Sequence, residues 1–147
     1  MSSLVKDDEL IYRLEENFRK VCYKIKLKGR EILNDFDITP PQFQALLLIN
    51  KNGALTIGEL SNQMYLACST VTDLLDRMER NDLVMRVKDE KDRRIVRIKM
   101  LEKGDVLIAG VMENRRNYIR EIVGDLDEEL LGSIDQSFIL LNDKVKF

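Results

Sequence analysis

The sequence of 147 residues predicts a mainly α-helical protein that carries one small β-hairpin. Apolar residues recur every three or four positions through most of the chain, which is the period of helices with one buried face. Apolar and polar residues alternate on both sides of a charged loop, over residues 83–88 and 95–100, as expected for two paired strands. Only two prolines and seven glycines interrupt these patterns, which leaves little room for long irregular loops.

The first half of the chain predicts two helices before the hairpin region. The first runs from about Asp7 to Asn34 and carries one apolar stripe. A second helix follows Thr39, whose hydroxyl can cap it, and its first turn takes Pro40 and Pro41, where a missing N–H costs least. This second helix is apolar nearly all round, so we expect it to be central and buried.

A short helix, a tight turn and a longer helix are predicted next. Thr56 can cap the short helix, and Glu59 at its third position completes a capping box. Leu55, just before it, can supply a short third strand. Ser69 is the expected N-cap of the longer helix, over residues 69–82, which gathers its apolar side chains on one face: Val71, Leu74, Leu75 and Met78.

The hairpin over residues 83–100 follows this helix pair directly, with the charged loop Asp-Glu-Lys-Asp-Arg-Arg at its tip. Met85 and Met100 are expected at core positions of the two strands. A helix-turn-helix with such a hairpin, called a wing, can fit one helix into a major groove of DNA and an arginine-tipped loop into a neighbouring groove.

The chain returns to a helical pattern from Glu102, and a last helix is predicted to start near Asp127. The first and last helices both carry apolar faces that a small winged domain cannot cover, so pairing with a second copy is expected. We therefore predict a dimerisation platform, 1–37 and 102–147, around a DNA-binding lobe, 38–101. The predicted dimerisation residues are Ile11, Leu14, Phe18, Leu130, Ile134, Phe138 and Leu141.

The net charge of −2, taken alone, argues against nucleic-acid binding, because such domains are usually basic. The charge is unevenly distributed, however. Residues 77–103 hold ten Lys and Arg against six Asp and Glu, whereas residues 104–147 hold five against nine. A local basic patch matters more for phosphate binding than the total charge.

The run from Ser69 to Gly104, with the wing element Asp92-Arg93-Arg94, resembles the MarR family of multiple-antibiotic-resistance-type regulators. The resemblance implies a homodimeric transcriptional regulator, usually a repressor, that binds a pseudo-palindromic operator and often responds to a small phenolic or anionic effector. It implies that Arg94 enters the minor groove and that Asp92 braces it. It also implies DNA contacts for Ser69, Thr70, Thr72 and Arg77. With three neighbours on the same helix and in the wing loop, the predicted DNA-binding set is Ser69, Thr70, Thr72, Asp73, Arg77, Lys91, Asp92, Arg93 and Arg94.

Three sites depart from the pattern of that family, and one of them is Leu101, which replaces the threonine common before the helix that opens at Glu102. Asp73 puts a carboxylate on the face that should meet DNA, where it can accept from a cytosine amino group or brace an arginine, but should weaken non-specific binding. Asn81-Asp82 occupies a helix end where glycine is usual, and both residue types tolerate the left-handed conformation. The alternative to a DNA-binding regulator is a winged-helix interaction adaptor that has lost DNA binding.

Composition excludes several other classes. No apolar run approaches the roughly 20 residues of a membrane helix, and the N-terminus lacks the features of a signal peptide. Two cysteines make no disulfide framework, which favours the reducing cytoplasm. The absence of histidine makes a transition-metal site, a cofactor or an enzyme improbable. Cys68, ahead of the longer helix, is either a redox switch or, as we favour, a small residue packed in the turn.

Overall fold

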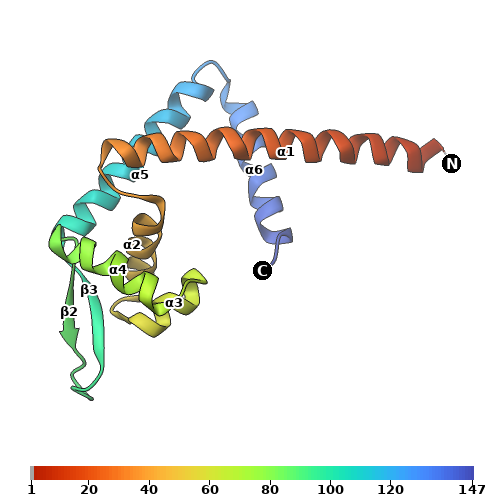
Figure 1. Cartoon of the computed structure of the whole chain (residues 1–147). Coiled ribbons are helices and arrows are strands. Elements are labelled where there is room, and N and C mark those ends of the chain that lie inside the picture. Colours follow the sequence, from red (N-terminus) through yellow and green to blue (C-terminus); the bar gives the residue numbers. More distant parts are fainter. Residues whose placement is uncertain (1) are drawn as a thin grey trace. The chain divides into compact units, whose positions relative to one another are not determined.

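The computed structural model describes residues 2–147, with side chains from Asp7 onward, and its predominantly helical architecture confirms the predicted class. Its contacts separate the chain into two compact units, Met1–Met112 and Glu113–Phe147. No described helix is long and apolar enough to cross a membrane. In chain order the elements are α1 (Ser2–Asp35), α2 (Pro40–Asn52), β1 (Leu55–Thr56), α3 (Ile57–Met64), α4 (Cys68–Arg80), β2 (Val84–Lys88), β3 (Val96–Met100), α5 (Glu102–Val123) and α6 (Glu128–Lys144) (Figure 1).

Capping boxes start both α2 and α3; the caps Thr39 and Thr56 and the partner Glu59 are those the sequence predicts, whereas the partner Gln42 was not predicted. Thr39 Oγ1 accepts from the N–H of Gln42 at 3.3 Å, and Gln42 Oε1 accepts from the N–H of Thr39 at 3.0 Å. Thr56 and Glu59 make the same reciprocal pair at the start of α3. Each box satisfies two N–H groups that a helix leaves unpaired, and so fixes where α2 and α3 begin.

The predicted N-cap of the longer helix is wrong by two residues. α4 begins at Cys68, and its N-cap is Ala67, which makes no side-chain hydrogen bond. Ser69 therefore lies within the first turn. The turn before it is set by Tyr65, which ends α3 in the left-handed conformation, with φ of 55°. Since that turn brings the chain into α4 two residues earlier than a Ser69 cap would need, Ser69 is free to present its exposed side chain outward.

The wing belongs to a three-stranded antiparallel sheet in the order β1-β3-β2, so Leu55 does contribute the expected third strand. Val84 pairs with Met100, and Arg86 pairs with Ile98, so these four side chains share one face of the hairpin. Val84 and Ile98 are buried in the core, whereas Met85 lies on the opposite face and is 39% exposed. The expectation that Met85 is a core residue is therefore wrong, because the β2 register turns Val84 inward instead.

One turn conformation and one close approach join the wing to the helices around it. Asp82 adopts φ of 59° at the end of α4, as its residue type allows, and the chain then enters β2. A side chain at Gly104, near the start of α5, would meet Met100 Sδ and lie 2.7 Å from the carbonyl oxygen of Leu83. Only glycine therefore allows α5 to pack this tightly on the base of the wing.

The second unit contains the end of α5 and all of α6. α6 starts next to Asp127, as predicted, and Asp127 caps it, because its Oδ1 accepts from the N–H of Leu130 at 2.8 Å. No residue of α6 is buried in the single chain. On its apolar stripe Leu130 and Phe138 are 47% and 58% exposed, and on the stripe of α1 Ile11 is 60% exposed.

Candidate nucleic-acid interface

The α4 helix has one buried face and one exposed polar face. Val71, Leu75 and Met78 are buried in the core and hold the helix in place, while Leu74 is partly buried. The opposite side carries the predicted contact residues Ser69, Thr70, Asp73 and Arg77, all exposed. Thr72 is half-buried, and its hydroxyl donates to the carbonyl oxygen of Cys68 at 2.9 Å. Its proton is thus engaged within the helix, and only its lone pairs are available to a partner.

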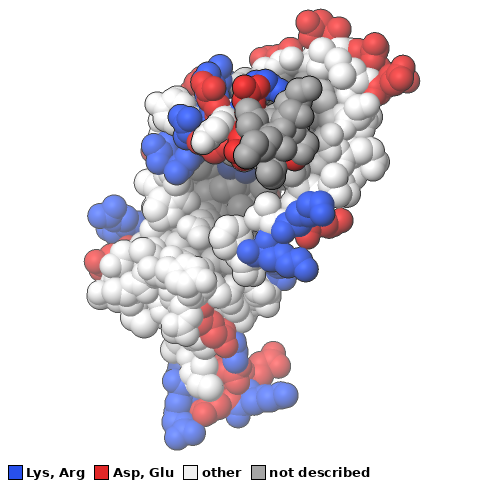
Figure 2. Space-filling view, turned by 90° about the vertical axis from the view of Figure 1, so that its right-hand side faces the viewer, with Lys and Arg blue, Asp and Glu red and all other residues white. Residues whose placement is uncertain are grey.

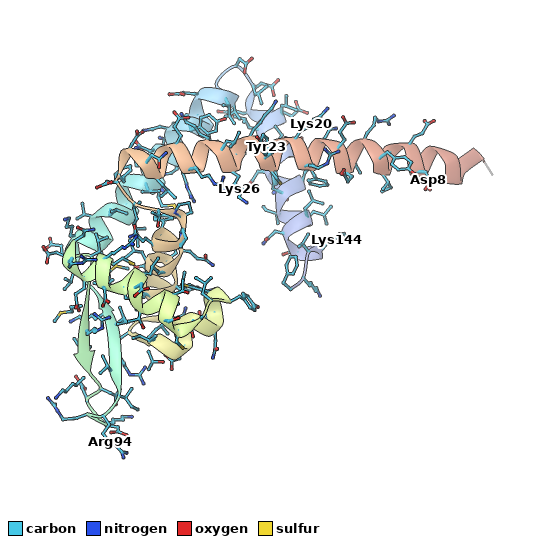
Figure 3. All side chains as sticks on the ribbon, in the orientation of Figure 1. Asp8, Lys20, Tyr23, Lys26, Arg94 and Lys144 are labelled. Carbon is cyan, nitrogen blue, oxygen red and sulfur yellow. The ribbon has the colours of Figure 1, made fainter. Side chains whose placement is uncertain are left out.

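The tip of the wing presents Arg94 on a carboxylate brace. Nε of Arg94 donates to Oδ1 of Asp92, and Nη2 donates to Oδ2, both at 3.0 Å. The N–H of Arg94 also donates to Asp92 Oδ1. The arginine side chain is nevertheless 91% exposed and lies at the free end of the hairpin (Figure 3). The hydrogen bonds from Arg94 hold the pKa of the Asp92 carboxyl below its usual value, so this brace stays charged at neutral pH.

The loop behind that tip is organised by Asp89. Its Oδ2 accepts from the N–H groups of Lys91 and Asp92, at 3.0 Å and 2.9 Å. Its Oδ1 accepts from Nε of Arg97, on the neighbouring strand, at 2.6 Å. These donors lower the pKa of the Asp89 carboxyl, the bond from Arg97 most of all. One carboxylate thus closes the wing loop and ties it to β3.

Arg97 also connects the wing to the start of α3. Its Nη1 lies 3.6 Å from Glu59 Oε2 and donates to the carbonyl oxygen of Ala54 at 3.4 Å. Glu59 is the residue that completes the α3 capping box. The loop end of the hairpin and the first helix of the helix-turn-helix therefore share one chain of ionic contacts.

A second arginine, Arg86 on β2, connects the wing to α4. Its Nη1 donates to Glu79 Oε1 at 2.9 Å, its Nη2 donates to Asp76 Oδ1 at 2.6 Å, and its N–H donates to Glu79 Oε2 at 2.9 Å. The two carboxylates raise the pKa of this guanidinium, with the bond from Asp76 contributing most. The pairs also neutralise two acids of α4 that would otherwise repel a polyanion.

The remaining charge explains how an acidic protein can present a basic surface. Of the three acidic residues in the wing loop, Asp89 and Asp92 are paired with arginines and Glu90 is exposed, while Lys91 and Arg93 are exposed as well. Figure 2 shows Lys and Arg side chains gathered around the tip of the hairpin at the lower end of the molecule. Asp73 is different, because its carboxylate makes no hydrogen bond or ion pair with any residue from Asp7 onward.

The predicted site residues thus fall into two groups on the winged lobe, one on the outer face of α4 and one at the wing tip. Three residues whose ion pairs hold the wing in place were missing from the prediction, namely Arg86, Asp89 and Arg97. Asp76 and Glu79, spaced three apart on one helix, were a detectable acidic pair. Their partner was not detectable, because only the fold brings β2 beside α4.

Comparison with known proteins identifies the lobe. The model of the MarR family matches residues 38–96, which span α2 to the start of β3. The HTH-type transcriptional regulator YsmB of Bacillus subtilis is 46% identical over 138 residues, and the match covers 94% of each chain. The chain belongs to the MarR family.

Other relatives agree with this membership. The solved structure of a MarR family protein from Bacillus stearothermophilus is 44% identical in sequence. The two superpose with a TM-score of 0.83, and the match covers 93% of this chain and 96% of that one. The HTH-type transcriptional repressor MdtR of Bacillus subtilis is 27% identical over 122 residues, or 83% of this chain and 79% of that protein. The winged helix-turn-helix inferred from the sequence is therefore confirmed as the fold of this MarR-family transcriptional regulator.

Proposed function

We propose that this MarR-family regulator is a homodimeric repressor that binds a pseudo-palindromic operator in double-stranded DNA. In this proposal α4 enters the major groove, and the wing reaches the adjacent minor groove. The observation that carries it is the pairing of Arg94 with both carboxylate oxygens of Asp92, which leaves the guanidinium 91% exposed at the hairpin tip. A narrow minor groove has an enhanced negative potential that attracts an arginine presented in this way.

Dimerisation is proposed because the helices at both ends of the chain expose apolar side chains. Ile11 is 60% exposed on α1, and Phe138 is 58% exposed on α6. A second copy is the economical cover for such faces. A dimer would also bring two α4 helices to successive major grooves, about 34 Å apart. We expect the protein in the cytoplasm, where its chromosomal target would lie.

A small phenolic or anionic effector is proposed as the signal, as the family resemblance implies. Its effect would be mechanical, because a rotation of either lobe changes the spacing of the two reading helices and thus weakens operator binding. Titrating such compounds into the protein–DNA complex tests this point. Release of DNA at saturating compound supports the proposal, and unchanged binding across a broad panel opposes it.

A gel shift against the promoter region of the protein's own gene, at several salt concentrations, tests the main proposal. We expect saturable binding that weakens steeply with salt, because phosphate contacts release counterions. The second candidate function is an interaction adaptor, and the unpaired carboxylate of Asp73 on the outer face of α4 favours it. A confirmed dimer that binds no duplex at about 50 mM salt would support the adaptor.

A further inference from the structure

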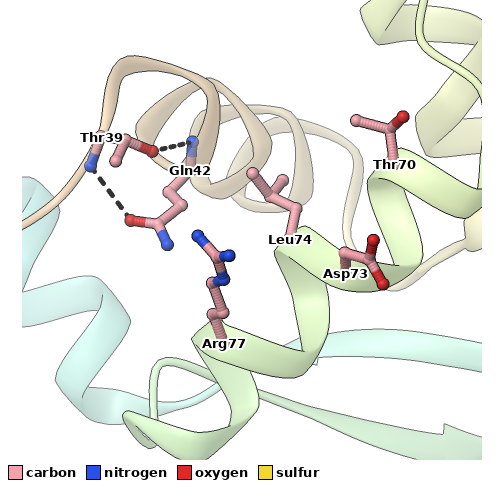
Figure 4. Close-up of a pocket in the computed structure, with 6 residues that line it drawn as sticks. All are labelled: Thr39, Gln42, Thr70, Asp73, Leu74 and Arg77. Atoms are coloured by element: carbon pink, nitrogen blue, oxygen red, sulfur yellow. Dashed lines mark hydrogen bonds between the residues drawn. The ribbon is translucent and has the colours of Figure 1, made fainter.

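A small polar pocket lies between the start of α2 and the exposed side of α4 (Figure 4). Its volume is about 250 Å³, and it lies wholly within the first unit. Gln42 and Arg77 face each other across it, and Asp73 lies at its other end with its carboxylate pointing away from both (Figure 4). The lining residues are Thr39, Gln42, Thr70, Asp73, Leu74 and Arg77.

Gln42 is held in one orientation by the capping box. It is only 9% exposed, and its Oε1 is engaged by the N–H of Thr39 at 3.0 Å. Because the oxygen is fixed there, the amide nitrogen Nε2 must point the other way, toward the guanidinium of Arg77 (Figure 4). Over residues 7–147 this nitrogen has no hydrogen-bond acceptor.

Arg77 brings more donors to the same place. Its guanidinium carries five N–H groups and makes no hydrogen bond or ion pair with any residue whose side chain the structure describes. Two sets of donors without an acceptor among the described residues therefore face each other, where the exposed side chain of Arg77 opens the pocket to solvent. An acceptor from outside, with several oxygens and a negative charge, would satisfy both sets at once.

We infer that Gln42 and Arg77 together bind a phosphate group of the DNA backbone beside the reading helix. The inference rests on the proposed function, and it adds a residue of α2 to the interface. The pocket borders Thr70 and Arg77 on the exposed face of α4, so a strand flanking the major groove passes next to it when α4 enters that groove. The amide of Gln42, held in place by its bond with Thr39, then sets how deeply and in which register α4 enters the major groove.

The variant Gln42→Glu separates this role from folding. Glutamate accepts from the N–H of residue 39 as glutamine does, and Glu59 already does so for Thr56 in α3. The donor is lost, however, and a negative charge takes its place. We expect an unchanged or higher melting temperature together with roughly tenfold weaker operator binding. Gln44→Glu, an exposed position on α2 outside the pocket, adds the same charge and should stay within about twofold of wild type.

Arg77→Gln tests the other half of the pair. We expect the slope of log K against log salt to become shallower by about 0.9, as for the loss of one phosphate contact. Adding Arg77→Gln to Gln42→Glu should cost less than it does in the wild type, because both changes disrupt one contact. Wild-type binding with no effect of either variant would overturn the inference, whereas no binding by the wild type itself would contradict the proposed function.

The same donors can bind either a phosphate of the DNA backbone or free inorganic phosphate. The side-chain amide signal of Gln42 in NMR spectra distinguishes these two ligands. A shift on adding operator duplex, and none with about 10 mM inorganic phosphate, supports a backbone phosphate. A shift that saturates with inorganic phosphate alone, and is unchanged by subsequent DNA, overturns the assignment to DNA.

Discussion

Arg86, on the first strand of the wing, donates from Nη2 to Oδ1 of Asp76 on α4 at 2.6 Å. The same guanidinium reaches Glu79, one turn further along α4, at 2.9 Å. The wing and the reading helix are thus joined by two ion pairs to one planar group, and the orientation of the wing is tied to that of α4. A residue that touches no DNA in this scheme can therefore affect how well the whole lobe fits an operator.

Replacing Arg86 with Gln should lower the free energy of unfolding by about 1–2 kcal/mol, because it leaves two carboxylates of α4 without their cation. Operator binding should weaken as well, since the wing is released and α4 becomes more negative. Denaturant unfolding and a binding titration measure the two effects. Arg19→Gln, which breaks an exposed pair with Glu15 on α1, is the matched control and should leave the denaturation midpoint nearly unchanged.

A double-mutant cycle with Arg94→Ala then tests whether Arg86 positions the wing. If it does, the loss of affinity caused by Arg94→Ala should be smaller in the Arg86→Gln background. Arg94 contributes less to operator affinity when the wing is no longer held to α4. Strictly additive losses would mean that Arg86 acts on stability alone.

Arg94→Ala in the wild type should weaken operator binding by roughly tenfold or more and leave the melting temperature unchanged. The side chain is 91% exposed and packs on nothing but Asp92, so its removal costs the fold little. Fluorescence anisotropy and thermal denaturation provide the two measurements. A clear drop in melting temperature would instead make Arg94 a structural residue and remove the main support for minor-groove binding.

The wing loop should lose its order in acid, because protonation of the Asp89 carboxylate weakens the hydrogen bonds that close the loop. Those bonds hold the pKa of this carboxyl below its ordinary value of 3.8. A carboxyl with a lowered folded-state pKa stabilises fully above its unfolded value, and this contribution is lost as the pH falls from there through the folded value. We therefore expect the amides of Lys91 and Asp92 to lose protection only below about pH 4. Hydrogen exchange at these two amides across pH 2–6 measures this loss, and Asp89→Ala, which removes both acceptor oxygens, should leave the amides poorly protected throughout.

Gly104→Ala should lower the free energy of unfolding by about 1–3 kcal/mol, because the new methyl group would overlap Met100 Sδ and approach the carbonyl oxygen of Leu83 to 2.7 Å. Gly58→Ala is the matched control. Its methyl would meet nothing closer than Thr56 Oγ1 at 3.9 Å, so it should stabilise α3 by up to about 1 kcal/mol. Equal effects at both positions would show that close packing at Gly104 does not constrain α5.

The elements that sequence predicts well here are those set by neighbours along the chain. Thr39 and Thr56 find their capping partners three residues away, and Asp92 finds Arg94 two residues away. Contacts such as Arg86 with Asp76 depend on how β2 lies against α4, and no local pattern encodes that. Met85 was misplaced for the same reason, because both faces of β2 carry apolar residues and only the register with β3 decides which one is covered.

Removing everything after Asp125 should convert the protein to monomers or aggregates. This truncation deletes α6, whose apolar residues include Leu130 and Phe138, 47% and 58% exposed in the single chain. If a second copy covers them, their loss leaves the partner's surface without its counterpart, and the assembly weakens. Analytical ultracentrifugation measures the assembly state, with Phe138→Asp in the full chain as a milder test. A well-behaved dimer of the truncated chain would mean that α6 does not contribute to dimerisation, and the proposed platform would then reduce to α1 and α5.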